Sequence, residues 1–477
     1  MIRWSLVVLM LQMFACSPTE GESGERWVGP ALPGLNIERV VMNQGVDVVM
    51  MENFSDYNGR NRAPIITGRK GLMRVYVEPQ DVWRPRVVQA ILTLRSGDLV
   101  TEHTANQFVS GKSTTPNLDS TFNFEVNAED IYVDTVFDLS LHEINPAERG
   151  LGTYDQQSWS SEGYTGYDIE QGEDVKLVIF PVRYNADGSG RLPALSDKQI
   201  QRYRDLFEAT YPLANLKIKI EDPMEVSYAI GPSGNGWNTM LGSMSAMRSI
   251  ADEPDSTYYY ALFKPDTSVE RYCAQGCILG LSLIGGANDV WSRASMGLGF
   301  AGEESAETMV HEVGHAHGRE HAPCGLYGQP FDANYPYSEG DLGTWGYDPR
   351  NDEMRKPSEN YDMMSYCDPL WVSDYTYAAL HRRITTLNSN TRSNTYAYWP
   401  GAVVMPDGSL DPIGDLKVAQ NHGGEPTSLK LIDGLERNAG EVTGYFTPFS
   451  HMEGGIVVYP PQAEGLTAVQ RLDSGTP

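Results

Sequence analysis

The chain has 477 residues, of which 40% are hydrophobic and 21% are charged, as in soluble globular proteins. This length exceeds what one hydrophobic core usually serves, so we expect roughly two to four domains. The formal net charge of −27 argues against nucleic acid and anionic membrane surfaces as partners, because both would be repelled. The carboxylates could hold Ca²⁺, but no calcium-loop signature in the sequence supports such a site.

The first 35 residues read as an export signal and a tether. One positive charge precedes an apolar run that has the length of a signal-peptide core and is too short to span a bilayer. Cys16 follows directly, which resembles a bacterial lipoprotein signal: residues 1–15 would be removed and Cys16 lipidated. The polar stretch "SPTEGESGER" comes after Cys16, and residues 16–35 are expected to form a flexible tether. Met13 and Phe14 depart from the lipoprotein pattern, so plain secretion is the alternative to an outer-membrane lipoprotein.

Residues 36–170 read as β structure. Runs such as "GLMRVYVEP" and "RVVQAILTLRS" alternate apolar and polar side chains, and Gly, Pro, Asn and Asp separate them. This pattern predicts a β-sandwich-like domain. No catalytic constellation is visible in it.

Residues 171–395 alternate between strand and helix patterns. The continuous apolar run 175–184 predicts a buried strand. A helix follows, with Ser196 or Asp197 as its N-cap and Pro212 at its end. Further alternation of the same kind predicts a layered α/β domain.

Apart from Cys16, four cysteines remain, and an even number in an exported chain favours two disulfides. Cys273 and Cys277 could close a small local loop, which would leave Cys324 to pair with Cys367. Three pairings are possible in all. A cysteine-rich zinc site is the competing interpretation, but the C-x-x-x-C spacing has no second pair of the zinc-finger kind.

Four of the nine histidines lie in the eleven residues "HEVGHAHGREH". His311 and His315 are four residues apart, so they share one face of a helix and can hold one metal ion. Gly318 would end the helix and let the chain turn, which brings His321 to the same ion. Glu312 lies beside the position of a bound water and is the candidate general base.

The complete string is H-E-x-x-H-x-x-G-x-x-H, and "NYDMMSYCDP" lies about forty residues downstream. There Met364, followed by Ser365 and Tyr366, matches a methionine turn. On these two motifs the chain resembles the metzincin zinc endopeptidases of the bacterial secreted type. The resemblance implies a multidomain α+β protein. Its metzincin-like α/β catalytic domain would hold a twisted sheet, an active-site helix, the methionine turn and a C-terminal helix, flanked by β-rich domains.

The resemblance also implies a ligand set and a mechanism. One Zn²⁺ ion would be held by His311, His315 and His321, and it would activate a water whose proton Glu312 accepts. Tyr366 would contact the metal or donate a hydrogen bond to the oxyanion.

The other residues near the motifs have expected structural roles. Met364 would lie beneath the imidazoles, and a Cys324–Cys367 disulfide would fasten the loop of the third ligand to the methionine turn. The alternative for Cys324 is an inhibitory zinc ligand. His317 falls between the ligand positions and is expected in the core. The apolar segment 294–300 is a candidate edge strand for a substrate peptide.

Residues 396–477 look β-like and are expected to form a small accessory region. Together these features predict a monomeric, exported zinc endopeptidase that acts on extracellular proteins, with a lipid anchor as its sole link to a membrane. Two alternatives stay open. One is a zinc hydrolase directed at cell-surface glycoproteins or mucins, and the other is a non-catalytic surface binding protein with a structural zinc site.

Overall fold

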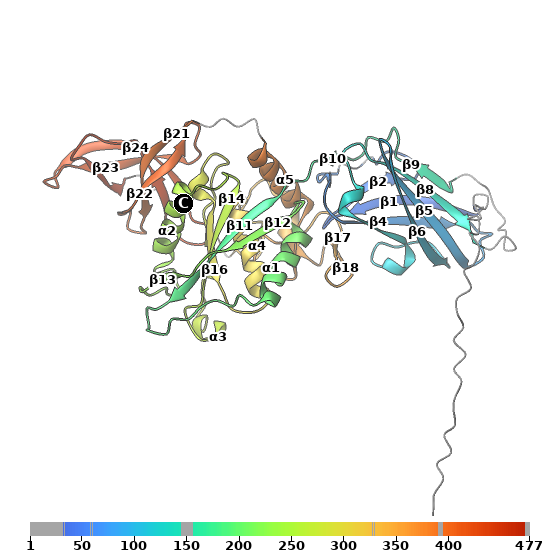
Figure 1. Ribbon diagram of the computed structural model, residues 1–477, viewed down its shortest axis with the longest axis horizontal. Helices are drawn as coiled ribbons and strands as arrows, with labels where there is room; N and C mark the ends of the chain where they lie inside the picture. The colour runs from blue at the N-terminus through green and yellow to red at the C-terminus, as the bar shows by residue number, and fades with distance from the viewer. Residues whose placement is uncertain are drawn as a thin grey trace, which may run out of the picture.

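The computed structural model describes residues 32–472, except for 33, 58, 60, 145–155, 327, 329 and 390–394. The expected signal peptide, Cys16 and most of the expected tether lie outside the described residues. Three units follow one another along the long axis of the molecule (Figure 1). They make a multidomain, strand-rich α+β protein. Within the described part of the chain, no helix is both long and apolar enough to cross a membrane.

The N-terminal unit is a sandwich of two antiparallel four-stranded sheets. One sheet contains, in order, β2 (Asp47–Glu52), β1 (Leu35–Asn43), β4 (Gly71–Pro79) and β7 (Phe122–Val126). The other contains β6 (Leu99–Val109), β5 (Arg86–Ser96), β8 (Val136–Glu143) and β9 (Ser158–Ser160). Beside them, β3 (Ile65–Ile66) pairs with β10 (Ile169–Glu170). Buried and partly exposed residues alternate along β5 and β8, whereas most of β4 is buried on both faces.

The central unit is built on a mixed sheet. Its strands are, in order, β12 (Leu216–Ile220), β11 (Val175–Tyr184), β14 (Thr257–Phe263), β16 (Ala294–Leu298) and β15 (Gly280–Ser282), and β13 (Met224–Val226) pairs with β11. All pairs are parallel except β15 with β16. The expectation that segment 294–300 supplies the edge strand is wrong, because β16 is paired on both sides. The edge strand next to the histidine helix is β15.

Both faces of this sheet are covered, which explains its continuous apolar strands. Tyr258 and Tyr260 of β14 point into the core shared with α1 (Asp197–Thr210), α4 (Glu303–Ala316) and α5 (Asp374–Asn388). Tyr259 and Phe263 point into a second core, which contains α2 (Trp237–Ile250). The short helix α3 (Val269–Tyr272) leads towards β15.

The helix boundaries have local causes. Ser196 is the N-cap of α1, as predicted, and its hydroxyl accepts a hydrogen bond from Gln199 N. Ser373 caps α5 in the same way, through Thr376 N. Four short strands lie in the loops between α4 and α5: β17 (Gly346–Asp348), β18 (Glu353–Arg355), β19 (Tyr361–Asp362) and β20 (Leu370–Trp371).

The C-terminal unit is a six-stranded antiparallel sheet. Its order is β22 (Leu410–Ala419), β21 (Tyr396–Val404), β25 (Gly455–Val458), β24 (Asn438–Pro448), β23 (Glu425–Ile432) and β26 (Thr467–Arg471). It packs so closely on α2 that a Cβ at Gly242 would lie 2.7 Å from Val403 Cγ2. Leu416 and Val458 share a core with Trp237 of α2. The sheet is therefore more than the small accessory region expected for 396–477, since it completes the core of the central unit.

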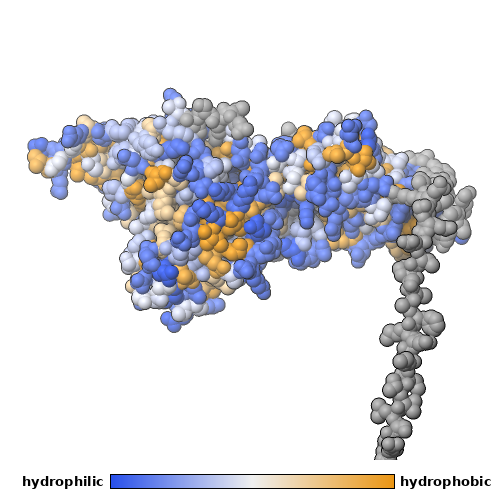
Figure 2. Space-filling view, viewed as in Figure 1, coloured by the Kyte–Doolittle hydropathy of each residue, from blue (hydrophilic) through white to orange (hydrophobic). Residues whose placement is uncertain are grey.

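On the face shown in Figure 2, hydrophilic residues predominate, in keeping with the charge of −27. Hydrophobic residues gather in a patch near the middle of this view.

Candidate metal centre

Helix α4 carries His311 and His315, and Gly318 follows its end. The first turn of the helix holds two glutamates, whose charges suit the positive end of the helix dipole. Gly318 has a φ of +81°, which a residue with a Cβ rarely adopts. This turn reverses the chain and brings His321 back to the face of α4 that bears the other two histidines.

The three motif imidazoles converge on one point. His315 Nε2 lies 3.0 Å from His311 Nε2 and 3.2 Å from His321 Nε2. In a tetrahedral zinc site with Zn–N bonds near 2.0–2.1 Å, neighbouring donors lie about 3.3 Å apart. Both distances from His315 thus fit a single metal ion of this size.

The opposite ring nitrogens are held by backbone carbonyls. His311 Nδ1 donates to Met363 O at 2.7 Å, and His315 Nδ1 donates to Arg319 O at 2.6 Å. These bonds leave the Nε2 lone pairs directed at the centre. Burial lowers the pKa of His311 to about 4 and that of His321 to about 2, so both are neutral at pH 7, the form that binds metal.

The segment expected to form the methionine turn packs on α4 at Gly314, between His311 and His315. Met364 is buried against α4 where Gly314 has no side chain; a Cβ there would lie 2.5 Å from Met364 Sδ. Asp362 holds the turn, because its carboxylate accepts hydrogen bonds from Met364 N and Ser373 N. The rings and the sulfur are thereby kept in a fixed arrangement.

Both cysteine pairs suggested by the sequence are disulfides in the structure. Cys324–Cys367 joins the loop of the third histidine to the methionine turn, with a Cα–Cα distance of 5.8 Å. Cys273–Cys277 closes a local loop before β15. Since Cys324 is bonded to Cys367, it is not available as an inhibitory zinc ligand.

His317 is not part of the centre. It is buried, its Nδ1 contacts Val313 O, and its ring stacks on Tyr258 with centroids 4.1 Å apart. The helical period points this side chain to the opposite side of α4 from His311 and His315.

A fourth histidine, which the sequence did not indicate, completes the cluster. His451 lies in the loop between β24 and β25, and one ligand nitrogen from each of the four histidines lies within 4.8 Å of the others. Its Nε2 lies 2.8 Å from Oε1 of Glu312. Nothing around residue 451 in the sequence resembles a ligand motif, so folding alone brings it here.

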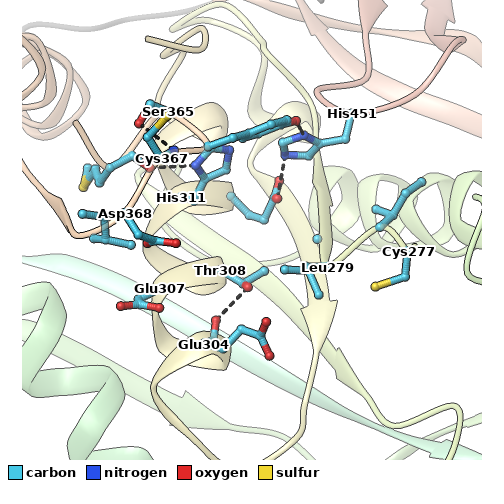
Figure 3. A pocket seen from close by; sticks show the side chains of 16 residues that line it. Cys277, Leu279, Glu304, Glu307, Thr308, His311, Ser365, Cys367, Asp368 and His451 are labelled. Carbon is cyan, nitrogen blue, oxygen red and sulfur yellow. Dashed lines mark hydrogen bonds and ion pairs between the residues drawn. The ribbon is translucent and has the colours of Figure 1, made fainter. Parts of the chain in front are cut away.

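Tyr366 lies beside the histidine cluster, with its ring centroid 5.0 Å from that of His321. Its hydroxyl forms a short hydrogen bond with His451 Nδ1 (Figure 3). Burial, followed by the charge of Glu312, raises the pKa of Tyr366 well above its usual range. The phenol is therefore protonated at neutral pH, and its hydroxyl contacts His451.

These groups lie in a cleft of about 490 Å³. One wall is the segment 277–280 that leads into β15, and the other is formed by α4 and the methionine turn (Figure 3). Glu307 lies along the cleft, where burial and then the neighbouring Glu303 raise its pKa to about 7. The cleft thus extends from His311 and Glu312 along α4.

Residues 282–368 match the family model described as Peptidase M66. The matched segment contains the three motif histidines, Glu312 and Met364. Together with the histidine cluster, the match supports a metal-dependent peptidase.

Two solved structures show weak similarity. Metalloproteinase-II from Bacteroides fragilis is 13% identical, with 52% of this chain and 73% of that chain covered and a TM-score of 0.20. A β-glucuronidase from Parabacteroides merdae is 10% identical, with 49% and 29% covered and a TM-score of 0.14. Scores this low carry no argument about fold or function. No curated protein matches the chain significantly.

Proposed function

We propose that the protein is a zinc-dependent endopeptidase of metzincin type that hydrolyses extracellular proteins. The observation that carries this proposal is the convergence of three neutral imidazoles beside a buried glutamate in an open cleft. Nitrogen donors in a set of three suit Zn²⁺, whereas Ca²⁺ prefers oxygen. A structural zinc site is closed by four ligands and has no use for a general base.

His311, His315 and His321 would hold the ion. When bound, zinc supplies a Lewis acid that activates water and polarises the scissile carbonyl. Glu312 accepts the proton of the attacking water and passes it to the leaving amine. Met364 and the Cys324–Cys367 disulfide hold these groups in fixed positions relative to one another.

The substrate would lie in extended form along the wall at 277–280. The close approach of this wall to the base supports the assignment, since a Cβ at Gly280 would lie 2.4 Å from Glu312 Oε1. A peptide that pairs with this segment places a carbonyl next to Glu312.

We also propose that the protein acts outside the cell, as a lipoprotein anchored through Cys16 or as a secreted protein. Its two disulfides support this location, because such bonds persist in oxidising compartments.

The test is metal analysis combined with cleavage of casein and of a mucin-type glycoprotein. The wild type should bind one zinc per chain and cleave casein. Glu312→Gln should keep the zinc and lose cleavage by about 10²- to 10⁴-fold, the usual contribution of a general base. Glu320→Gln, which changes an exposed glutamate eight residues away, is the matched control and should behave as wild type. Undiminished cleavage by Glu312→Gln would contradict the proposal.

A further inference from the structure

We infer that His451, which the C-terminal sheet supplies, is a catalytic residue whose Nε2–H donates a hydrogen bond to the substrate oxygen that gains charge beside Glu312. The inference rests on the proposed peptidase function and deepens it. It assigns to the C-terminal sheet a direct part in the reaction.

The loop that carries His451 is fixed to the central unit. Phe449 is buried in the core that the sheet shares with α2. Ser450 N donates to Ser282 O, and Ser282 N donates to Ser450 Oγ, each at 3.0 Å. The loop therefore continues the pairing at the end of β15 and places His451 at the centre.

The ring of His451 faces the metal centre evenly. Its centroid lies 5.1 Å from that of His311, 5.1 Å from that of His315 and 4.9 Å from that of His321. Figure 3 shows it beside His311, and its Nε2 lies 2.8 Å from Oε1 of Glu312. A group bound at the open coordination position would contact this imidazole.

The Nε2 atom of His451 is buried, and its capacity to form a hydrogen bond is unsatisfied within the described residues. It has no hydrogen bond to any described residue, and its 2.8 Å contact with Glu312 Oε1 lacks hydrogen-bond geometry. A buried polar atom without a hydrogen bond is costly and is often found where a ligand will bind. Here the missing partner would lie between the base and the three ligand rings.

Tyr366 and Ser450 set the orientation of these groups. The Tyr366 hydroxyl is hydrogen-bonded to Nδ1 of His451, and when the hydroxyl donates this bond the ring proton is on Nε2. Ser450 Oγ donates to Glu312 Oε2 at 3.3 Å, so the base is contacted from the same loop. When the water oxygen bonds to the scissile carbon, its proton goes to Glu312 and the negative charge develops on the carbonyl oxygen. The Nε2–H of His451 is available to stabilise that charge.

A role as fourth metal ligand fits the contacts of His451 less well. Donors around one zinc ion lie about 3.3 Å apart, and the two motif contacts of 3.0 and 3.2 Å meet this spacing. Both ring nitrogens of His451 face other groups: Nδ1 contacts the Tyr366 hydroxyl, and Nε2 lies 2.8 Å from Glu312 Oε1. The three motif histidines are the ligand set that the geometry favours.

The test compares His451→Ala and His451→Gln with wild type in the full chain. Loss of one oxyanion donor should lower kcat of His451→Ala about 10²- to 10³-fold. KM should change less than about threefold, and His451→Gln, whose amide can donate, should recover part of kcat. Zinc stoichiometry and the visible absorption spectrum of the Co²⁺-substituted protein should stay as in wild type. His422→Ala, a histidine of the same sheet that packs on Trp399 and Tyr445, is the matched control.

Several outcomes would overturn the inference. Unchanged or increased kcat in His451→Ala would show that the side chain does not assist the reaction. Loss of zinc or an altered Co²⁺ spectrum would make His451 a metal ligand instead.

If the wild type binds zinc but cleaves no protein, the proposed function is wrong. A double-mutant cycle of melting temperatures, measured on the metal-free protein, then still tests the contact between His451 and Glu312. The Tm shifts of His451→Ala and Glu312→Ala should be less than additive in the double variant. Additive shifts would refute the assignment.

Discussion

Replacing Gly280 by alanine adds one methyl group beside the proposed base. The new Cβ would lie 2.4 Å from Glu312 Oε1, 2.5 Å from its Cγ and 2.7 Å from its Cδ. Ordinary contact begins at 3.4 Å, so the carboxylate must retreat by about 1 Å. A displacement of about 1 Å at a reacting group can lower the rate about 10²-fold. We therefore expect kcat of Gly280→Ala to fall by about two orders of magnitude.

Stability should change much less than activity. The clash involves the far end of one side chain, which can move, and the backbone at Gly280 needs no positive φ. The assay is steady-state cleavage of a fluorogenic peptide by zinc-loaded protein, with zinc content and Tm measured on the same samples. Gly434→Ala is the matched control, because a Cβ there meets nothing within 4 Å. A kcat within about threefold of wild type would refute the assigned position of the base.

Two further predictions concern stability. Replacing Cys324 and Cys367 by serine should cost about 4 kcal/mol, the chain-entropy value for a loop of this length, and should weaken zinc retention against a chelator; an unchanged Tm under non-reducing conditions would contradict it. Glu307 has a pKa raised by burial from 4.5 to about 7, so the folded protein binds more protons than the unfolded chain between these values. Its contribution to stability is accordingly present below pH 4.5 and is lost as the pH rises towards 7. The Tm of wild type should fall over this window relative to Glu307→Gln, and parallel Tm–pH curves for the two proteins would count against the prediction.

Much of the metal centre could be predicted because its parts are local in sequence. The helical period places His311 and His315 on one face, and Gly318 turns the chain so that His321 joins them. The same period puts His317 on the other side, where Tyr258 stacks on its ring. The methionine turn is farther away, yet a short string of residues identifies it.

For the segment 294–300, the sequence pattern did not predict the position of the strand in the sheet. Its apolar character is compatible with a central or an edge strand, and pairing with β15 makes it central. Strand order depends on contacts between distant segments, which a local pattern does not contain. The strand at the edge is β15. It is only three residues long, which is too short for a sequence pattern to predict it.

The sequence by itself determined the histidine motif with its adjacent Glu312, the segment around Met364 and the α+β class, because each depends on periodicity or spacing within a short stretch. Tertiary structure alone decided the place of His451. Its loop reaches the centre because the C-terminal sheet packs on α2 and Ser450 pairs with Ser282 at the end of β15. Burial of apolar surface between two units sets that position, and this surface is scattered over residues 237 to 458. Tyr366 depends on both sequence and fold. The sequence motif identified the residue, whereas the tertiary structure determined that its hydroxyl bonds to His451.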